Sequence, residues 1–243
     1  MSAVFHAQIE RREPNGIPVW LFHKPDVAET VPVIVLHGLN SRKERHLELC
    51  LRLADAGLTA CAMDLRSHGD RRDDDSPLLL GDRTTETFAG AFGRCVTGTA
   101  RDLAPLADTL GWETFGVVGH SLGGYVALQA AVNEPRIAAL AVLSGAIDVS
   151  GTTTDGALLH DIAACGAHFA GRSTLFLHGT ADELVPVAGA RRFCEALMLA
   201  CNETTERVAL IEYPELGHTL SEEMLCAAVD WMARHLMEAN ATR

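Results

Sequence analysis

The chain has 243 residues, of which 48% are hydrophobic and 21% are charged, so it is long enough and apolar enough to bury a substantial core. Acidic residues outnumber basic ones by 32 to 20, and the formal net charge is -12. A field of this sign disfavours non-specific binding to nucleic acid. We therefore expect one domain covering residues 1–243, with a small-molecule substrate and no nucleic-acid partner, and we leave a homodimer open.

The sequence shows no targeting or membrane signal. Its N-terminus lacks a basic start followed by an apolar run, and no segment approaches the roughly 18 continuous apolar residues of a membrane span. The 7 cysteines are scattered, odd in number and without a C-x-x-C pair, which favours reduced, buried thiols over a zinc site. We expect a cytoplasmic protein with no membrane partner, no metal and no cofactor.

The chain begins with two predicted strands, about 3–11 and 17–23, around the turn signal Pro14-Asn15-Gly16. Near-continuous apolar runs follow, as expected of strands buried on both faces of a parallel sheet. These runs cover residues 31–37, 59–64, 115–119, 137–145, 173–179 and 207–213. Pro32 stands near the start of the first run, where a missing N–H is tolerated.

Helical patterns fall between these runs, at residues 41–56, 97–110, 121–133, 187–200 and 220–239. The first of them opens with Ser41-x-x-Glu44, a capping box, and stops near Gly57. Alternating strands and helices with short connections predict an α/β fold. We expect a mostly parallel, doubly wound sheet of about eight strands with an antiparallel N-terminal hairpin.

Two stretches break this alternation, residues 66–96 and 146–172. Both follow predicted strands and therefore emerge at the carboxyl edge of the sheet, where open α/β sheets bind ligands. The first stretch has two interpretations of equal weight. It is either a cleft wall or small lid, or a solvated loop that leads into an extended helix.

The segment Gly119-His-Ser121-Leu-Gly123 matches the pattern G-x-S-x-G. In this pattern a serine on a sharp strand-to-helix turn exposes its hydroxyl, and the glycines avoid collisions with neighbouring backbone. The pattern alone is common by chance, but here a predicted strand precedes it and a predicted helix follows. Ser121 is therefore the predicted nucleophile.

A serine nucleophile needs an adjacent base, and in this chain order the base is a histidine preceded by a carboxylate. His218 lies in a turn directly after the last predicted strand, from which its ring can reach the serine, so we assign it as the base. His235 lies on a predicted helix, and we expect it to be an ordinary residue of that helix's polar face. Asp182 follows a strand and precedes a helix, so we assign it to the acid. Its alternative role is to cap that helix. The other candidate acids are Glu183, Asp148 and Asp155.

Acyl transfer builds negative charge on the former carbonyl oxygen, and backbone N–H groups stabilise that charge. One expected donor of this oxyanion hole is the N–H of Leu122, directly after the serine. The other is the N–H of Leu39, in the loop after the strand that ends at His37. Gly38 would allow the close backbone approach, and the side chain of Asn40 is a less favoured donor.

Several polar residues near these motifs have competing interpretations. His37 could be a metal ligand or a second base, but we favour a buried, hydrogen-bonded anchor of its loop, and we favour the same role for His178. Arg66 and His68 are expected to tie a loop together rather than to contact substrate. The residues expected to shape the substrate pocket, from their positions beside the motifs, are Leu39, Leu184 and Val185.

Four motifs in this order resemble those of the α/β-hydrolase superfamily. They are His37-Gly38-Leu39, Gly119-His-Ser121-Leu-Gly123, His178-Gly-Thr-Ala-Asp182 and Gly217-His218. The stretch 36–44 looks like that of small bacterial carboxylesterases near the dienelactone-hydrolase branch. Dienelactone hydrolases carry a cysteine nucleophile where this chain has Ser121. The short span between Gly145 and Ser173 predicts a minimal cap or none.

The resemblance implies an α/β-hydrolase fold and a carboxylesterase-like serine hydrolase. We predict hydrolysis of short-chain carboxylic esters through an acyl-enzyme, because a site without a large cap suits small esters. Thioesterase, lactonase, aminopeptidase or perhydrolase action would use the same three residues. A competing hypothesis from another class is a non-catalytic ligand receptor on the same fold, which an intact set of three residues disfavours.

Overall fold

The computed structural model describes residues 7–25, 30–145, 166–201 and 206–241. Within them, eight strands form one sheet in the order β1-β2-β4-β3-β5-β6-β7-β8. The strands are β1 (Gln8–Arg12), β2 (Val19–His23), β3 (Pro32–Leu36), β4 (Thr59–Met63), β5 (Phe115–His120), β6 (Ile137–Leu143), β7 (Ser173–Gly179) and β8 (Val208–Tyr213). β2 pairs antiparallel with β1 and β4, and the remaining pairs are parallel. The predicted mostly parallel, doubly wound sheet is confirmed.

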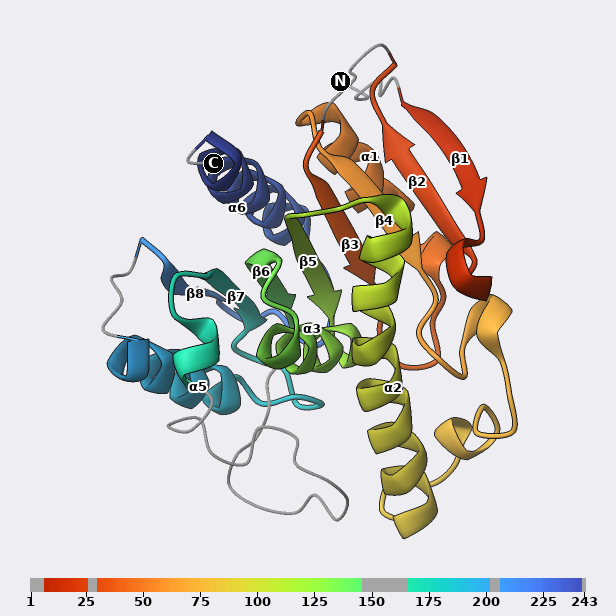
Figure 1. Ribbon diagram of the computed structural model, residues 1–243. Helices are drawn as coiled ribbons and strands as arrows, with labels where there is room; N and C mark the ends of the chain where they lie inside the picture. Colours follow the sequence, from red (N-terminus) through yellow and green to blue (C-terminus); the bar gives the residue numbers. More distant parts are fainter. Residues whose placement is uncertain (1–6, 26–29, 146–165, 202–205, 242–243) are drawn as a thin grey trace.

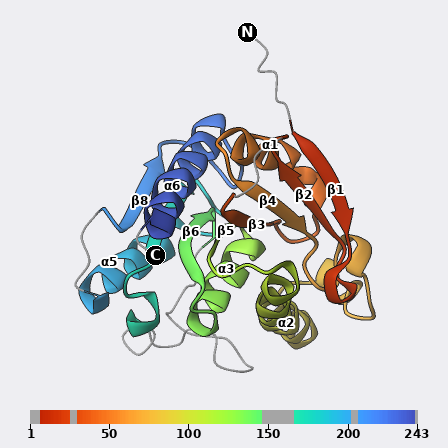
Figure 2. The same ribbon diagram turned by 45° about the horizontal axis from the view of Figure 1, so that its top comes forward.

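Helices cover both faces of this sheet (Figure 1). They are α1 (Leu47–Asp55), α2 (Glu86–Leu110), α3 (Leu122–Asn133), α5 (Val187–Cys201) and α6 (Glu222–Ala241). α1 and α6 contact each other on one face, and α2, α3 and α5 lie on the other, as the turned view shows (Figure 2). No helix in the described ranges combines the length and the hydropathy that crossing a membrane requires.

The continuous apolar runs are explained by the two cores that these helices create. In β3, Val33 and Val35 belong to the core under α1 and α6, whereas Ile34 and Leu36 belong to the core under α2, α3 and α5. Successive side chains of a strand point to opposite faces, so a strand with two covered faces needs apolar residues throughout. Pro32 is the first residue of β3, as its missing N–H requires.

The predicted hairpin is present, with a single short 3-10 turn at Pro14–Gly16 between β1 and β2. Asn15 and Gly16 adopt φ of 52° and 72°, the left-handed conformation that an Asn-Gly pair supplies with least strain. The part of the first predicted strand before residue 7 lies outside the described residues.

The predicted capping box at Ser41 and Glu44 is wrong. The helical segment begins as a 3-10 turn at Lys43–His46, and no side chain next to it in sequence caps it. Instead Asp64, at the end of β4, accepts the N–H of Lys43 at 2.8 Å. The carboxylate of Asp64, which is distant in sequence, therefore caps this helical segment in place of Ser41. The predicted stop at Gly57 is confirmed, with φ of 86°.

Residues 66–96 were expected to form either a cleft wall or small lid, or a solvated loop that leads into an extended helix. The segment up to Thr85 is a loop with short 3-10 turns, and α2 then begins eleven residues before the predicted start at 97. The Thr85 hydroxyl caps this helix by accepting the N–H of Phe88 at 3.2 Å. Glycines at 90, 93 and 98 lower the helix propensity of this stretch and hid it from the sequence pattern. The second irregular stretch, with its predicted minimal cap, lies outside the described residues up to 165.

The other predicted helices and strands are confirmed to within about two residues at each end. Six cysteines fall in the described residues, and none of these six forms a disulfide with another of them. Cys50, Cys61, Cys95 and Cys194 are buried, as predicted, but Cys226 is exposed and Cys201 is half-buried. Cys165 lies outside the described residues.

Candidate active site

Ser121 occupies the sharp turn between β5 and α3. Its backbone has φ of 52° and ψ of −115°, a conformation that L-residues rarely adopt and that marks stored strain at a functional position. The turn is so tight that a Cβ on Gly119 would lie 2.2 Å from the carbonyl oxygen of Gly123, and a Cβ on Gly123 would lie 2.4 Å from that of Leu36. Both glycines of the motif are therefore required by the backbone around the serine.

Ser121, His218 and Asp182 form one chain of hydrogen bonds. The Ser121 hydroxyl lies 3.0 Å from Nε2 of His218. Nδ1 of the same ring lies 2.8 Å from Oδ2 of Asp182. His218 follows β8 and Asp182 follows β7, so the carboxyl ends of three parallel strands bring these residues together although 97 positions separate the serine from the histidine. The sequence predicted all three members of this arrangement.

The Asp182 carboxylate is held by the turn that follows it. Its Oδ1 accepts the N–H groups of Leu184 at 3.0 Å and Val185 at 2.8 Å, which leaves Oδ2 for His218. It does not cap α5, since that helix begins only at Val187. Glu183 is exposed, and the side chain of Asp182 is fully buried. The more distant candidates Asp148 and Asp155 lie outside the described residues.

His178 anchors the same loop, as expected. Its Nε2 hydrogen-bonds the carbonyl oxygen of Val185 at 2.7 Å and lies 3.4 Å from Oδ2 of Asp182. The predicted polar-face position of His235 is wrong, because its side chain is 8% exposed and packs on Trp231 with ring centroids 4.2 Å apart. His235 is therefore a largely buried residue of α6, and His218 is the histidine that reaches the serine.

In the loop after β3, the backbone of Gly38 packs closely against Ser121. A Cβ on Gly38 would lie 3.3 Å from the Cβ of Ser121, so only glycine allows this approach without displacing a neighbour. Leu39 and Leu122 both line the cavity beside the serine. Within the described part of the chain, neither of their backbone N–H groups has a hydrogen-bond partner. The Asn40 N–H, in contrast, donates to Nε2 of His68 at 3.1 Å.

His37 holds the peptide that carries the Leu39 N–H. Its Nδ1 donates to the carbonyl oxygen of Gly38 at 2.7 Å, and its Nε2 accepts the N–H of Leu65 at 3.1 Å. In a trans peptide the carbonyl and the N–H point in opposite directions. The ring that binds the Gly38 carbonyl therefore turns the Leu39 N–H away from itself. His37 is fully buried and acts as the loop anchor that the sequence suggested.

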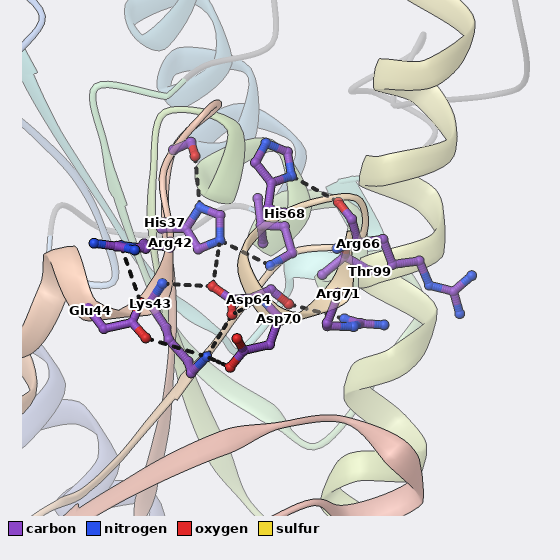
Figure 3. A network of polar contacts seen from close by, with 12 residues as sticks. His37, Arg42, Lys43, Glu44, Asp64, Arg66, His68, Asp70, Arg71 and Thr99 are labelled. Carbon is purple, nitrogen blue, oxygen red and sulfur yellow. Dashed lines mark hydrogen bonds and ion pairs between the residues drawn. The ribbon is translucent and has the colours of Figure 1, made fainter. Parts of the chain in front are cut away.

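A buried carboxylate organises the far side of this loop (Figure 3). Asp64 accepts the Lys43 N–H at 2.8 Å, the Lys43 ammonium at 2.7 Å and the Asp70 N–H at 3.0 Å, and it lies 3.4 Å from His37. Burial alone would raise the pKa of Asp64, but the neighbouring His37 ring and the hydrogen bonds from Lys43 and Asp70 hold that pKa well below its usual range. Asp64 and Lys43 are both fully buried, so each charge depends on the other.

His68 and Arg66 tie the next loop to this frame, as predicted. Nδ1 of His68 donates to the Arg66 carbonyl at 2.9 Å, which leaves Nε2 free to accept from Asn40. Burial lowers the pKa of His68 and keeps the ring in this neutral state. Arg66 makes a bidentate pair with Asp102 of α2 at 2.8 and 2.6 Å, and its N–H donates to Thr99.

Two further histidines, which the sequence did not single out, continue from His218 in a row of three rings. The ring of His120 stacks on His218 at 5.6 Å, and His46 meets His120 edge-on at 5.7 Å. Burial, together with the neighbouring rings, lowers the pKa of His120 to about 3 and that of His46 to about 4. Both rings are therefore neutral near pH 7, and they place no competing positive charge beside His218.

A cavity of about 290 Å³ opens beside Ser121. Its described lining residues are Gly38, Leu39, Ser41, Arg83, Phe88, Phe92, His120, Ser121, Leu122, Tyr125, Leu184, Val185 and His218. The structure thus brings the predicted pocket residues Leu39, Leu184 and Val185 to the wall of this cavity. Arg83, Phe88 and Phe92 come from residues 66–96, the stretch expected to be either a cleft wall or small lid or a solvated loop, and Tyr125 comes from α3. No motif singled out these four residues individually.

Comparison with known proteins agrees with the fold. The chain is a serine hydrolase of the α/β-hydrolase superfamily. Residues 29–172 match the family described as serine aminopeptidase, S33, and the chain belongs to that family. The resemblance that the four sequence motifs suggested is confirmed.

Among similar curated proteins is one from Bacillus subtilis (strain 168) named "Putative esterase YitV", which is 24% identical over 261 residues and matches over 94% of this chain and 99% of its own. Among solved structures, TT1662 from Thermus thermophilus superposes with a TM-score of 0.75 at 24% identity, over 95% of this chain and 98% of that one. A cold-adapted esterase from an Arctic intertidal metagenomic library gives a TM-score of 0.68 at 17% identity, over 94% and 93% of the two chains. These structural likenesses show a shared fold.

Proposed function

We propose that the protein is a carboxylesterase that cleaves short-chain esters through an acyl-enzyme. Ser121 is the nucleophile, His218 the general base and Asp182 the group that orients the base. The observation that carries this proposal is the hydrogen-bonded chain from Ser121 Oγ through both ring nitrogens of His218 to Asp182, at 3.0 and 2.8 Å. This geometry matches what the activation of a serine hydroxyl requires.

The arrangement supports a complete two-step reaction. Nε2 of His218 takes the Ser121 proton as Oγ attacks the ester carbonyl, and it then returns that proton to the departing alcohol. Water hydrolyses the acyl-enzyme by the same transfers in reverse order. Asp182 stabilises the positively charged ring that forms in each step, while the neutral His120 beside it adds no repulsion.

The oxyanion hole is assigned to the N–H groups of Leu39 and Leu122. Donors that are fixed before the reaction stabilise the developing oxyanion by about 3 kcal/mol each. The His37 ring supports the Leu39 donor in two ways. Its Nδ1–H fixes the Gly38 carbonyl, and the hydrogen bond that it donates to that oxygen polarises the peptide that carries the Leu39 N–H.

The size and lining of the cavity support short-chain substrates. A volume of about 290 Å³ lies at the lower end of ligand pockets. The wall formed by Leu39, Leu184 and Val185 offers apolar contact to a short acyl chain, as does the aromatic side formed by Phe88 and Phe92.

Aminopeptidase action is the alternative that the family description raises. A site that reads a charged amino terminus generally offers a carboxylate to it. None of the described residues that line the cavity is an aspartate or a glutamate. The acidic run 73–75 is engaged elsewhere, since Asp75 pairs with Arg94 at 2.8 Å and Asp73 bonds Ser67 and Ser76. We therefore favour esters over peptides.

Hydrolysis of p-nitrophenyl esters from acetate to dodecanoate, with Ser121→Ala in parallel, tests the proposal. Turnover that peaks at short chains and disappears in the variant is the expected result. Thioesters, lactones and aminoacyl anilides measured beside them would reveal a different use of the same three residues. Binding of esters without turnover over hours would overturn the proposal in favour of a receptor.

A further inference from the structure

Arg83 stands out among the residues around the cavity. It lies in the loop between the 3-10 turn Leu78–Leu80 and the start of α2, and its side chain lines the cavity that contains Ser121. Arginine remains positively charged at any pH that a protein survives. Within the described residues that line this cavity, Arg83 is the one side chain with a permanent charge. The chain as a whole has a net charge of -12, so a cation at this wall does not follow from the overall composition.

No acidic side chain of the described residues neutralises Arg83. The structure gives it no ion pair and no hydrogen bond with any described residue, and it is exposed to solvent. The carboxylate of its neighbour Asp82 instead accepts the N–H and the hydroxyl of Thr84 at 2.9 and 2.8 Å. Three other arginines of residues 66–96 do have partners, since Arg66 and Arg71 pair with Asp102 and Arg94 pairs with Asp75. Among the described residues, none competes with a ligand for the guanidinium of Arg83.

Aromatic side chains line the same cavity as this cation. Phe88 and Phe92 follow Arg83 on the first turns of α2, and Phe92 meets Tyr125 edge-on at 5.6 Å. Phe88 and Phe92 are themselves in ring contact at 5.9 Å. The cavity thus presents a nucleophile, an aromatic wall and a cation. A molecule that satisfies all of them has an ester, an apolar spacer and an anionic end.

We propose that Arg83 selects esters that carry a second, anionic group, and that the preferred substrates of this site are esters with a carboxylate elsewhere in the molecule. The inference rests on the proposed esterase function and names the class of substrate. Arg83 offers a bidentate pair to that carboxylate. The same charge repels an ammonium group, so amino-terminal peptides and cationic esters are selected against.

Three ethyl esters of equal acyl length test the proposal. Ethyl caproate is neutral, monoethyl adipate ends in a carboxylate and ethyl ε-aminocaproate ends in an ammonium group. The readout is the ratio of kcat/KM for the anionic ester to that for the neutral one, measured by pH-stat. In Arg83→Gln this ratio is expected to fall about tenfold, the size of effect that one charge-assisted hydrogen bond supplies, mainly through KM. The cationic ester should become a better substrate.

Arg83→Lys and Arg101→Gln are the matched controls. Lysine keeps the charge but loses the bidentate geometry, so its ratio should lie between those of the wild type and Arg83→Gln. Arg101 is an exposed residue of α2, roughly 20 Å further along the helix at 1.5 Å per residue. Its variant makes the same change in net charge and should leave the ratio within twofold. An equal fall in Arg101→Gln would overturn the proposal, as would a ratio that stays unchanged in Arg83→Gln both for this pair and for a pair with the carboxylate on the leaving group.

The carboxylate can lie on either side of the ester, and a second pair of substrates separates these cases. In para-acetoxybenzoate the charge is on the leaving group, and its methyl ester is the neutral partner. A fall of the ratio in Arg83→Gln for the adipate pair places the carboxylate in the acyl group. A fall for the benzoate pair alone places it in the leaving group. Either result supports the role of Arg83, whereas a ratio of kcat/KM that falls in neither pair contradicts it.

Failure of the proposed function gives a different result. If Ser121→Ala retained hydrolysis of all three ethyl esters, the nucleophile would be wrong whatever Arg83 does. Binding of monoethyl adipate to Ser121→Ala, measured by calorimetry, needs no turnover. Its affinity should fall about tenfold when Arg83→Gln is added, and no binding at millimolar concentrations would contradict the selection by Arg83 alone.

Discussion

The two halves of the site are held in place by different physical means. Ser121 owes its position to its own strained turn and to the glycines beside it, and Asp182 to hydrogen bonds from the two residues that follow Glu183. The loop with Leu39 depends on groups far away in sequence, above all on Asp64 at the end of β4. Local geometry fixes the reacting groups, and a buried ionic network fixes the proposed oxyanion donor.

This difference has a consequence for substitutions. Changes among the reacting groups should remove activity and leave the fold unaffected, because these groups contribute little to the packing of either core. Changes in the network should lower stability first, because they leave a buried charge without its partner. The predictions below test this separation, from the largest expected effect to the smallest.

Asp182→Asn should reduce kcat on a p-nitrophenyl ester by about four orders of magnitude, because the base loses its correct tautomer and the stabilisation of its charge. The melting temperature should change little. Glu183→Gln is the matched control, and it should retain activity within about twofold since Glu183 is exposed. The reverse pattern in steady-state kinetics would transfer the role of the acid to Glu183.

Asp64→Asn should lower the free energy of unfolding by about 3 kcal/mol, because the ammonium group of Lys43 loses its fully buried counter-charge and keeps only the more exposed carboxylates of Asp70 and Glu44. Urea unfolding followed by circular dichroism measures this loss. Asp74→Asn, at an exposed position of the neighbouring loop, removes the same charge and should change stability by less than about 0.5 kcal/mol. Equal losses in both variants would show that the buried network has no special role.

His37→Phe should lower kcat by about tenfold to hundredfold with little change in KM, less than the full loss of an oxyanion donor, because the Leu39 N–H is retained but no longer directed. His37→Gln, whose amide can donate to the Gly38 carbonyl, should recover part of the activity. A purely structural role predicts a lower melting temperature and normal kcat in the folded fraction. Stability and kinetics measured on the same samples distinguish the two.

His46→Phe should flatten the pH dependence of stability. In the folded protein the pKa of His46 is lowered to about 4 by burial, whereas in the unfolded chain it is near 6.5. The unfolded state therefore binds the proton first, and stability falls as pH drops from about 6.5 towards 4. Between pH 7 and pH 5 the variant should lose about 1–2 kcal/mol less than the wild type in urea unfolding. The exposed His168→Gln is the control and should follow the wild type.

The features positioned by local sequence could be predicted, whereas those positioned by residues distant in sequence could not. The sheet, its hairpin and the residues Ser121, Asp182 and His218 were predictable because each is encoded by a short pattern next to a strand. The start of α2 was missed because its glycines mask a helix that tertiary packing stabilises. The Ser41 capping box failed because Asp64 provides the cap from another strand.

The cavity wall was least predictable of all. Leu184 and Val185 were found because they adjoin the acid, but Arg83, Phe88 and Phe92 reach the serine only through the path of the loop and helix before them. No spacing rule relates these residues to Ser121. The residues to which we attribute specificity therefore lie in the part of the cavity that no local sequence motif marks.

Covalent labelling by a fluorophosphonate tests the central claim most directly, because the reagent reacts with an activated serine through displacement of fluoride. We predict a single adduct on Ser121 in the intact protein, located by mass spectrometry of the digested chain, with loss of labelling in Ser121→Ala and strong suppression in His218→Gln. An unlabelled wild-type protein, or an adduct that persists in Ser121→Ala, would contradict the assignment of Ser121 as the nucleophile.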